Sequence, residues 1–247
     1  VYTIDSGPAA GVTAAAMLGK KMEYPNILYF DMGGTTAKIC VIRDYQPAIT
    51  TQFWADGKYF IGAPIVDMVE IGAGGGSIVW LDSAGSVHIG PQSAGANPGP
   101  ACYNAGGTNA TITDADLALG YINPDYFLGG EMQVDINASI AAIQKNVACK
   151  LDISVEEAAF GVYRLANANM LSAMRVVTVQ RGYDPREFAM VVSGGTAAIH
   201  AVRMAQELHV PKVVFPMTPG TYSALGLVTA DVRCDLFRSY VTRSADA

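Results

Sequence analysis

The sequence predicts an α/β protein with a mixed β-sheet and long helices. Short apolar runs bounded by glycine turns, such as 26–31 and 188–193, are typical of buried strands. Helical segments such as 197–208 alternate with these runs along the chain. The chain has 247 residues, of which 51% are hydrophobic and 15% are charged, so it has enough apolar material for a substantial core. We expect one α/β unit without internal repeats.

The first half of the chain is predicted to start with a helix and to continue in strands. Ser6, Gly7 and Pro8 are typical of a helix start, and a run of small residues follows to position 19. Three strands of a meander are expected at 26–31, 37–43 and 49–53. A hairpin is expected to join 77–81 to 86–89.

The second half of the chain is predicted to be richer in helix. Residues 90–107 are irregular and rich in glycine and proline, and loops of that length are often functional. Ser154 and Glu157 have the spacing of a capping box, which opens a long helix toward 180. The other expected elements are a short helix within 113–130, helices at 137–149, 197–208 and 221–231, and strands at 188–193 and 212–215.

Composition and charge exclude several functions. The formal net charge is −6 and there is no basic run, so nucleic-acid binding has no support. No apolar run approaches the ~20 residues that cross a bilayer. The four cysteines are widely spaced and form no CxxC pair, which favours a reducing, cytoplasmic compartment over a disulfide framework.

The segment 31–36 (DMGGTT) is the sharpest candidate for chemistry. Its glycines allow backbone N–H groups to approach an anion closely, and its threonine hydroxyls add donors. The carboxylate of Asp31 can hold a water or a water-bound Mg²⁺ near a phosphate. The pattern therefore predicts a phosphate-binding turn, with an ordinary glycine hairpin as the alternative.

A second turn of this kind lies at 193–196 (SGGT), between a predicted strand and a predicted helix. The unpaired amides and the dipole of a helix N-terminus suit an anion or the polar edge of a nucleotide. Close packing of the helix on the strand is the alternative role for these glycines. We interpret His200, near the start of this helix, as a capping or core hydrogen-bonding residue rather than a base.

The glycine-rich segment 71–77 is a poor match to a dinucleotide motif, because it does not open a helix. We expect this loop to face a substrate or a neighbouring domain. The residues that would do so are Gly74, Gly75, Gly76 and Ser77.

Cys102 lies in the irregular loop 93–103, which is a second candidate for the substrate or partner face. Catalysis by a cysteine nucleophile has little support, because no histidine lies beside Cys102 in the sequence. Asp67, Glu70 and Cys102 are possible metal ligands, but they lack a ligand spacing that would support this hypothesis.

Six motifs occur in order, at 6–11 (SGPAAG), 31–36 (DMGGTT), 71–77 (IGAGGGS), 90–95 (GPQSAG), 97–103 (NPGPACY) and 223–226 (SALG). Together they closely resemble the hydantoinase A / oxoprolinase family. That family includes N-methylhydantoinase A subunits, 5-oxoprolinase, and acetone and acetophenone carboxylase subunits. The resemblance extends from residue 6 to about residue 239, and six ordered motifs make it specific.

The resemblance implies a lobe of the RNase H-like, actin-like ATPase type, in which two lobes hold ATP and Mg²⁺ between them. Asp31 would then begin the second phosphate loop and hold Mg²⁺ through water. The nucleotide-binding residues would be Gly33, Gly34, Thr35, Thr36, Gly194, Gly195 and Thr196. The sequence departs from the family at Lys38, where an acidic residue is common, and at 196–198, where Ala-Gly-Pro is common.

The resemblance also implies that residues 1–247 form one domain of a longer subunit. The sequence has no second Asp-x-Gly-Gly-Thr motif and no initiator methionine, so we expect it to be the second lobe. The implied partners are the N-terminal lobe, a B-type subunit and a small-molecule substrate. One lobe lacks half of the nucleotide cleft, so we expect little ATPase activity from it alone.

The activity that the resemblance implies is ATP-dependent hydrolysis of a cyclic amide of the hydantoin or 5-oxoproline type. Phosphorylation of the amide oxygen would make the amide carbon a better electrophile, which water can then attack. An ATP-dependent carboxylase subunit acting on acetone- or acetophenone-type ketones is one alternative. A non-catalytic assembly domain, whose glycine loops bind a partner subunit, is the other.

Overall fold

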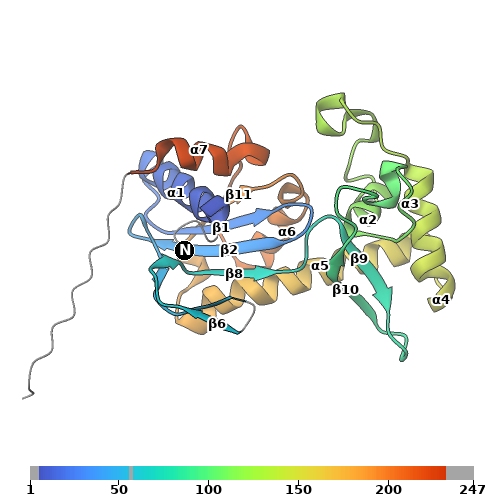
Figure 1. The fold of residues 1–247 in the computed structure, drawn as a ribbon, viewed down its shortest axis with the longest axis horizontal. Coiled ribbons are helices and arrows are strands. Elements are labelled where there is room, and N and C mark those ends of the chain that lie inside the picture. Colours follow the sequence, from blue (N-terminus) through green and yellow to red (C-terminus); the bar gives the residue numbers. More distant parts are fainter. Residues whose placement is uncertain (1–5, 56–57, 232–247) are drawn as a thin grey trace, which may run out of the picture.

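The computed structural model describes residues 6–55 and 58–231. Its main sheet has the order β12-β11-β1-β2-β3, and β8 also pairs with β2. The strands are β1 (Ile27–Met32), β2 (Ala37–Arg43), β3 (Gln46–Pro47), β8 (Met68–Ile71), β11 (Ala189–Ser193) and β12 (Lys212–Val214). β11 is parallel to both β1 and β12, whereas β2 is antiparallel to β1. This mixed sheet with flanking helices confirms the predicted α/β fold class (Figure 1).

Helices cover both faces of the sheet. On one face, α1 (Ser6–Lys21) and α7 (Tyr222–Thr229) pack over the alternate residues of β1 that include Tyr29. On the other face, α5 (Val155–Val177) and α6 (Ala197–Leu208) pack over those that include Phe30. A Cβ atom at Gly11 of α1 would clash with the Tyr29 hydroxyl group, so glycine is required for this close approach.

Residues 77–153 form a second part of the molecule, which we call the insert, between β8 and α5. Figure 1 shows it beside the sheet. It contains the hairpin β9 (Ser77–Leu81) and β10 (Val87–Ser93), then α2 (Ile112–Ala118), α3 (Ile136–Ile143), a π-helical turn at 144–148 and α4 (Cys149–Leu151). One continuous hydrophobic cluster includes Phe30 of the sheet together with Ile112 and Ile143 of the insert. The insert and the sheet therefore share a core.

Most predicted elements are present, but the prediction that 49–53 forms the third strand of the meander is wrong. That segment enters two small separate sheets, β4 (Ile49–Thr50) with β7 (Ile65–Val66), and β5 (Phe53–Ala55) with β6 (Tyr59–Ile61). Pro47 has no N–H group to donate, so β3 ends there after a tight turn. β8 takes the expected place beside β2 instead.

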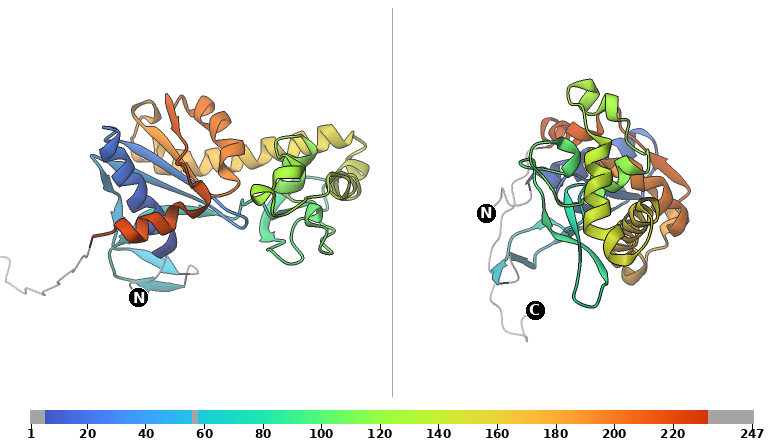
Figure 2. Two further views of the ribbon diagram at one scale, coloured as in Figure 1. Left: turned by 90° about the horizontal axis from the view of Figure 1, so that it is seen from above. Right: turned by 90° about the vertical axis from the view of Figure 1, so that its right-hand side faces the viewer.

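The 23-residue helix α5 runs from the insert to the sheet (Figure 2). The predicted capping box is confirmed, because Glu157 N–H donates to Ser154 Oγ at 3.1 Å and Ser154 N–H donates to Glu157 Oε2 at 3.0 Å. Across residues 6–55 and 58–231, no helix has both the length and the apolar character that crossing a bilayer would require.

Candidate functional site

Asp31 lies at the carboxyl end of β1, where two neighbouring strands bring polar residues beside it. The parallel pairing of β1 with β11 places Ser193 next to Asp31, and the antiparallel pairing with β2 places Lys38 on its other side. Lys38 is in turn paired with Glu70 of β8. Directly paired residues project to the same face of a sheet, so Ser193, Asp31, Lys38 and Glu70 form one row across four strands. We call these four residues the polar row.

Hydrogen bonds and an ion pair connect the polar row to its surroundings. Lys38 Nζ donates to Thr36 Oγ1 at 2.6 Å and lies 3.1 Å from Glu70 Oε1. At the other end of the row, Ser193 Oγ is 2.6 Å from the Tyr29 hydroxyl oxygen. The row therefore holds a hydroxyl, a carboxylate, an ammonium and a second carboxylate in fixed order.

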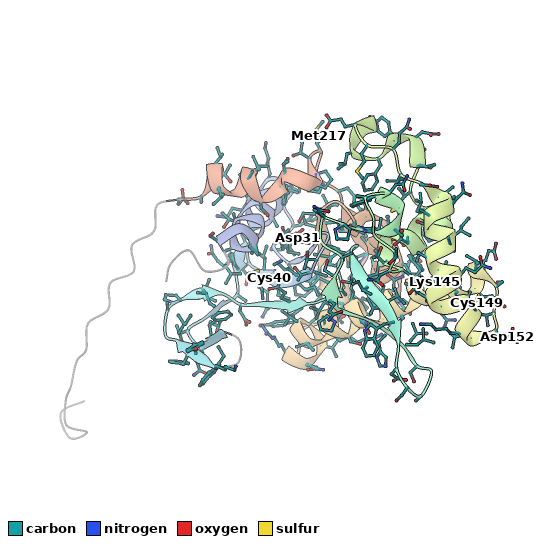
Figure 3. All side chains as sticks on the ribbon, turned by 45° about the vertical axis from the view of Figure 1, so that its right-hand side comes forward. Asp31, Cys40, Lys145, Cys149, Asp152 and Met217 are labelled. Atoms are coloured by element: carbon teal, nitrogen blue, oxygen red, sulfur yellow. The ribbon has the colours of Figure 1, made fainter. Side chains whose placement is uncertain are left out.

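The environment of Asp31 makes its charged form less favourable than in an exposed aspartate. Burial raises the pKa of the Asp31 carboxyl, and the hydrogen bond from Ser193 and the positive charge of Lys38 offset part of this effect. Asp31 is half-buried and lies centrally, between the sheet and the insert (Figure 3). An added cation near this carboxylate would therefore relieve an unfavourable charge.

The loop that follows Asp31 has an open outer surface. Gly33 N–H donates to Thr36 O at 3.2 Å, which closes the turn between β1 and β2. A Cβ atom added at Gly33 or at Gly34 would have no neighbour within 4 Å, and Gly34 and Thr35 are exposed. This open backbone is compatible with the predicted approach of a phosphate.

The structure places the turn at 194–196 directly against the Asp31 loop. Gly194 has a φ of +88°, and a Cβ atom there would lie 2.6 Å from Asp31 Oδ1, so both the backbone and the space require glycine. Thr196 N–H donates to Met32 O at 3.2 Å. Thr196 precedes α6 without a side-chain cap, and a Cβ atom at Gly195 would meet nothing within 4 Å. The start of α6 is therefore open to an anion.

The glycine loop before β9 lies behind the Asp31 loop instead of on an open face. Gly74, Gly75, Gly76 and Ser77 are all buried. Gly75 N–H donates to Gly33 O at 3.0 Å, and Gly76 N–H donates to Gly34 O at 2.6 Å. These contacts correct the expected orientation of the loop, because in this chain its residues support the backbone of the phosphate loop.

Gly75 also joins the two candidate nucleotide loops through a shared contact. A Cβ atom at Gly75 would lie 2.7 Å from Thr113 Oγ1 and 2.8 Å from Thr196 Oγ1. Thr113, in the first turn of α2, donates its N–H group to Gly75 O at 2.8 Å. Three loops that are far apart in the sequence thus meet here. The sequence reasoning did not identify Thr113.

The reasoning from the sequence also missed the roles of Ser193, Lys38 and Glu70 within the row. Lys38 was noted as a departure from the family, and Ser193 as part of a motif. Side chains alternate between the two faces of a strand, so Lys38 and Cys40 lie on the same face of β2. Once β2 pairs with β1, this face also carries Asp31, and the alternation was therefore a usable signal for Lys38. Glu70 gave no such signal, since its position depends on the long-range pairing of β8.

Cys102 does not line an open face. It is fully buried with Leu117 and Val134, and its backbone N–H donates to Asp114 Oδ1 at 2.9 Å. Burial raises the pKa of the Cys102 thiol, which disfavours the thiolate.

The hypothesis of a metal site at Asp67, Glu70 and Cys102 is also wrong. Among the described residues, no three His, Cys, Asp or Glu side chains are grouped closely enough to hold a metal ion. Asp67 pairs with Arg181, and Glu70 pairs with Lys38.

His200 is a core residue, as interpreted from the sequence. It is fully buried, with Nδ1 at 2.9 Å from Asn167 Oδ1 and Nε2 at 3.4 Å from Asp116 Oδ2. Burial raises the pKa of the Asp116 carboxyl, and the contact with His200 partly offsets this effect. The Asp116 and His200 pair therefore lies inside the protein, beneath the start of α6.

A family model and individual relatives both identify the same protein family. Residues 1–236 match a model of the family described as hydantoinase/oxoprolinase. Over 249 aligned residues the chain is 40% identical to caprolactamase subunit alpha of Pseudomonas jessenii, covering 100% of this chain and 35% of that subunit. It is also 35% identical to 5-oxoprolinase 1 of Arabidopsis thaliana, covering 95% of this chain and 20% of that protein.

Solved structures share this fold. A nucleotide-free structure of acetone carboxylase, from work on ATP-dependent acetone carboxylation, superposes with a TM-score of 0.85 at 33% identity. The crystal structure of the ATP-dependent caprolactamase from Pseudomonas jessenii superposes with a TM-score of 0.81 at 39% identity. Each match covers 91% of this chain and 32% of the other. The chain thus spans about a third of the length of these proteins.

Proposed function

The chain belongs to the hydantoinase/oxoprolinase family, and from this premise we propose that it is an ATP-binding lobe of an enzyme that activates cyclic amides. In the proposed reaction the γ-phosphoryl group of ATP moves to the amide oxygen and ADP leaves; water then opens the ring and phosphate is released. The name of the 40% identical caprolactamase subunit, which denotes hydrolysis of a cyclic amide, supports this substrate class. Hydantoin and 5-oxoproline are further substrates of the same class.

One structural observation carries the proposal. The loop after β1 and the turn before α6 lie against each other, with Asp31 at their junction and open glycines on both sides. Backbone N–H groups at such turns and at helix N-termini bind phosphates. A nucleoside triphosphate along this junction would meet both elements at once, with its phosphates at 33–36 and its nucleoside end at 194–196.

The residues have separate proposed roles. Asp31 would hold Mg²⁺ through water, which fits a half-buried carboxylate whose pKa burial raises. Gly33, Gly34, Thr35 and Thr36 would cradle phosphate groups. Gly194, Gly195 and Thr196 would contact the nucleoside end. Mg²⁺, when bound, supplies charge neutralisation on the phosphates.

The polar row adds a role for Lys38. Lys38 is paired with Asp31 on one side and with Glu70 on the other. Its ammonium group also donates a hydrogen bond to the Thr36 hydroxyl group. Lys38 would therefore keep the Thr36 hydroxyl group oriented in the phosphate loop.

The chain spans between about a fifth and about a third of the length of these relatives, so the rest of the enzyme is also part of the proposal. We propose that residues 1–247 form one lobe, that a second lobe completes the nucleotide cleft, and that a B-type subunit completes the enzyme. The relatives are described as alpha, beta and gamma subunits, which supports an assembly of several chains.

A ketone carboxylase subunit is the second candidate function. The superposition on acetone carboxylase, with a TM-score of 0.85, supports this candidate, because it shows that the chain has the same fold as part of a ketone carboxylase. The same phosphate site would then phosphorylate an enol oxygen in place of an amide oxygen.

The test is calorimetric titration of Mg·ATP and Mg·ADP into the chain and into its Asp31→Ala variant. We expect saturable binding that the substitution weakens at least tenfold, which is about 1.4 kcal/mol. Asp125→Ala, at an exposed site in the insert, is the matched control and should bind like the wild type.

Equal binding by the wild type and by Asp31→Ala would contradict the assignment of Asp31. If neither the chain nor the complete enzyme binds nucleotide, the alternative of a non-catalytic assembly domain would replace the ATPase proposal.

A further inference from the structure

A cavity of about 380 Å³ lies beside the phosphate loop, between the main sheet and the small strands β4, β5 and β7. Its wall includes Lys38 of β2 and Glu70 of β8, together with Gln52, Phe53 and Met68. Lys38 also donates to Thr36 of the phosphate loop and is paired directly with Asp31. Side chains that are paired in this way lie about 5 Å apart at their Cβ atoms, so the cavity is next to the proposed site of phosphoryl transfer.

The charges around this cavity are already neutralised. Its charged wall residues are Lys38, Asp67 and Glu70. Lys38 Nζ is 3.1 Å from Glu70 Oε1, and Asp67 accepts two hydrogen bonds from Arg181, at 2.5 and 3.2 Å. A carboxylate on a ligand would find no unpaired cation here and would lose its hydration.

The remaining wall offers a match for an uncharged ring with an amide group. Phe53, Val66 and Met68 provide apolar surface for the methylene groups of a ring. The Gln52 side chain has both a donor and an acceptor, and Lys38 has a third N–H beyond those that Thr36 and Glu70 engage. A cyclic amide presents one C=O acceptor and one N–H donor.

We infer that this cavity is the acceptor subsite and that it selects uncharged cyclic amides over those that carry a carboxylate. The inference rests on the proposed function, because it places the acceptor of the phosphoryl group beside Asp31. Lys38 would donate to the carbonyl oxygen, and the ring would lie against Phe53. The pairing of Lys38 with Glu70 sets the preference for an uncharged ligand.

Two lactams test this inference directly. ε-Caprolactam is uncharged, whereas 5-oxoproline is a lactam with a carboxylate. We expect titration of the ¹⁵N-labelled chain, without nucleotide, to give saturable amide shifts with caprolactam at 38, 50–53 and 66–70. The same concentrations of 5-oxoproline should give no saturable shifts there.

Substitutions in the wall sharpen the test. Gln52→Ala should weaken caprolactam binding by about three- to tenfold, and Thr51→Ala, next to it and outside the wall, should not. Glu70→Gln removes the carboxylate partner of Lys38, so it should improve 5-oxoproline binding on the order of tenfold. Dispersed spectra of each variant confirm that it folds.

The inference is wrong if caprolactam shifts map to another surface, if they are absent, or if wild-type chain binds both lactams equally. Because nucleotide is absent, these results do not depend on the ATP titration. Asp31→Ala should retain caprolactam binding, so failure of the nucleotide site and failure of the lactam subsite are distinguishable.

Discussion

Asp31 and Asp114 are both aspartates close to glycine-rich loops, but their surroundings differ. Asp114 is fully buried and accepts hydrogen bonds from Ala101, Cys102 and Ser139 and from both the backbone and the hydroxyl group of Thr111. Asp31 is half-buried, has a raised pKa, and lies beside the open loop that includes Gly33 and Gly34. The carboxylate of Asp114 is fully used by hydrogen bonds within the protein, whereas the carboxylate of Asp31 can still accept hydrogen bonds from a ligand or a bound water.

This difference separates a structural carboxylate from one available to a ligand. A carboxylate with several donors inside the fold fixes loop geometry, and its removal leaves those donors without partners. A carboxylate with few protein partners contributes less to folding and more to binding. Substitutions at the two positions should therefore affect different measurements.

The largest expected effect is the loss of stability in Asp114→Ala. The substitution leaves buried N–H and O–H groups unpaired, so it should lower the free energy of unfolding by about 3–5 kcal/mol. Urea denaturation measures this loss, with Asp125→Ala as the control, expected to stay within about 0.5 kcal/mol of the wild type. A loss in Asp114→Ala no greater than in that control would remove the distinction between the two carboxylates.

A smaller effect should separate the two sets of glycines around Asp31. A Cβ atom at Gly74 would lie 2.5 Å from backbone atoms of Thr35, so Gly74→Ala should destabilise the fold by about 1–3 kcal/mol. Gly34→Ala meets no atom within 4 Å and should leave stability within about 0.5 kcal/mol, yet it should weaken Mg·ATP binding. Thermal unfolding and calorimetry measure the two effects. Equal unfolding temperatures for both variants would contradict the supporting role of Gly74.

The smallest effect is a pH-dependent gain of stability in Asp31→Asn. Because burial raises the pKa of Asp31 in the folded state, its ionisation favours unfolding, and this cost is present above the folded pKa. The cost disappears as pH falls below the ordinary pKa of aspartate, about 3.9. Asp31→Asn should therefore be more stable than the wild type at pH 7 and equal to it at the acidic end. A gain that does not change with pH would show that Asp31 is not penalised by its charge.

Local signals were sufficient for much of the fold. The strands β1 and β2, the helix α6 and the capping box of α5 each depend on residues close in sequence, and all were predicted. The glycine turns at 33–34 and 194–195 were identified for the same reason. Local signals alone do not bring the two turns to one junction, because this depends on the parallel pairing of β1 with β11, more than 150 residues apart. Only the family resemblance implied that both turns contact the same nucleotide.

The missed features depend on long-range pairing or on competition between similar motifs. The burial of 74–77 and the placement of Glu70 both follow from the pairing of β8 with β2. The sequence pattern had instead predicted that 49–53 would be the third strand of the meander, but this segment pairs elsewhere. Thr111 and Asp114 have the spacing of a capping box, so the anchoring role of Asp114 had a local signal that was not used.

The long helix α5 has a consequence for how the molecule unfolds. Its 23 residues span about 35 Å, and it packs against both β2 of the sheet and α2 of the insert. Loss of the insert would remove side-chain contacts with this helix, such as that between Tyr121 and Tyr163, whose ring centroids are 5.1 Å apart. The sheet and the insert therefore form one cooperative folding unit, and amide protons in both should exchange through the same global opening.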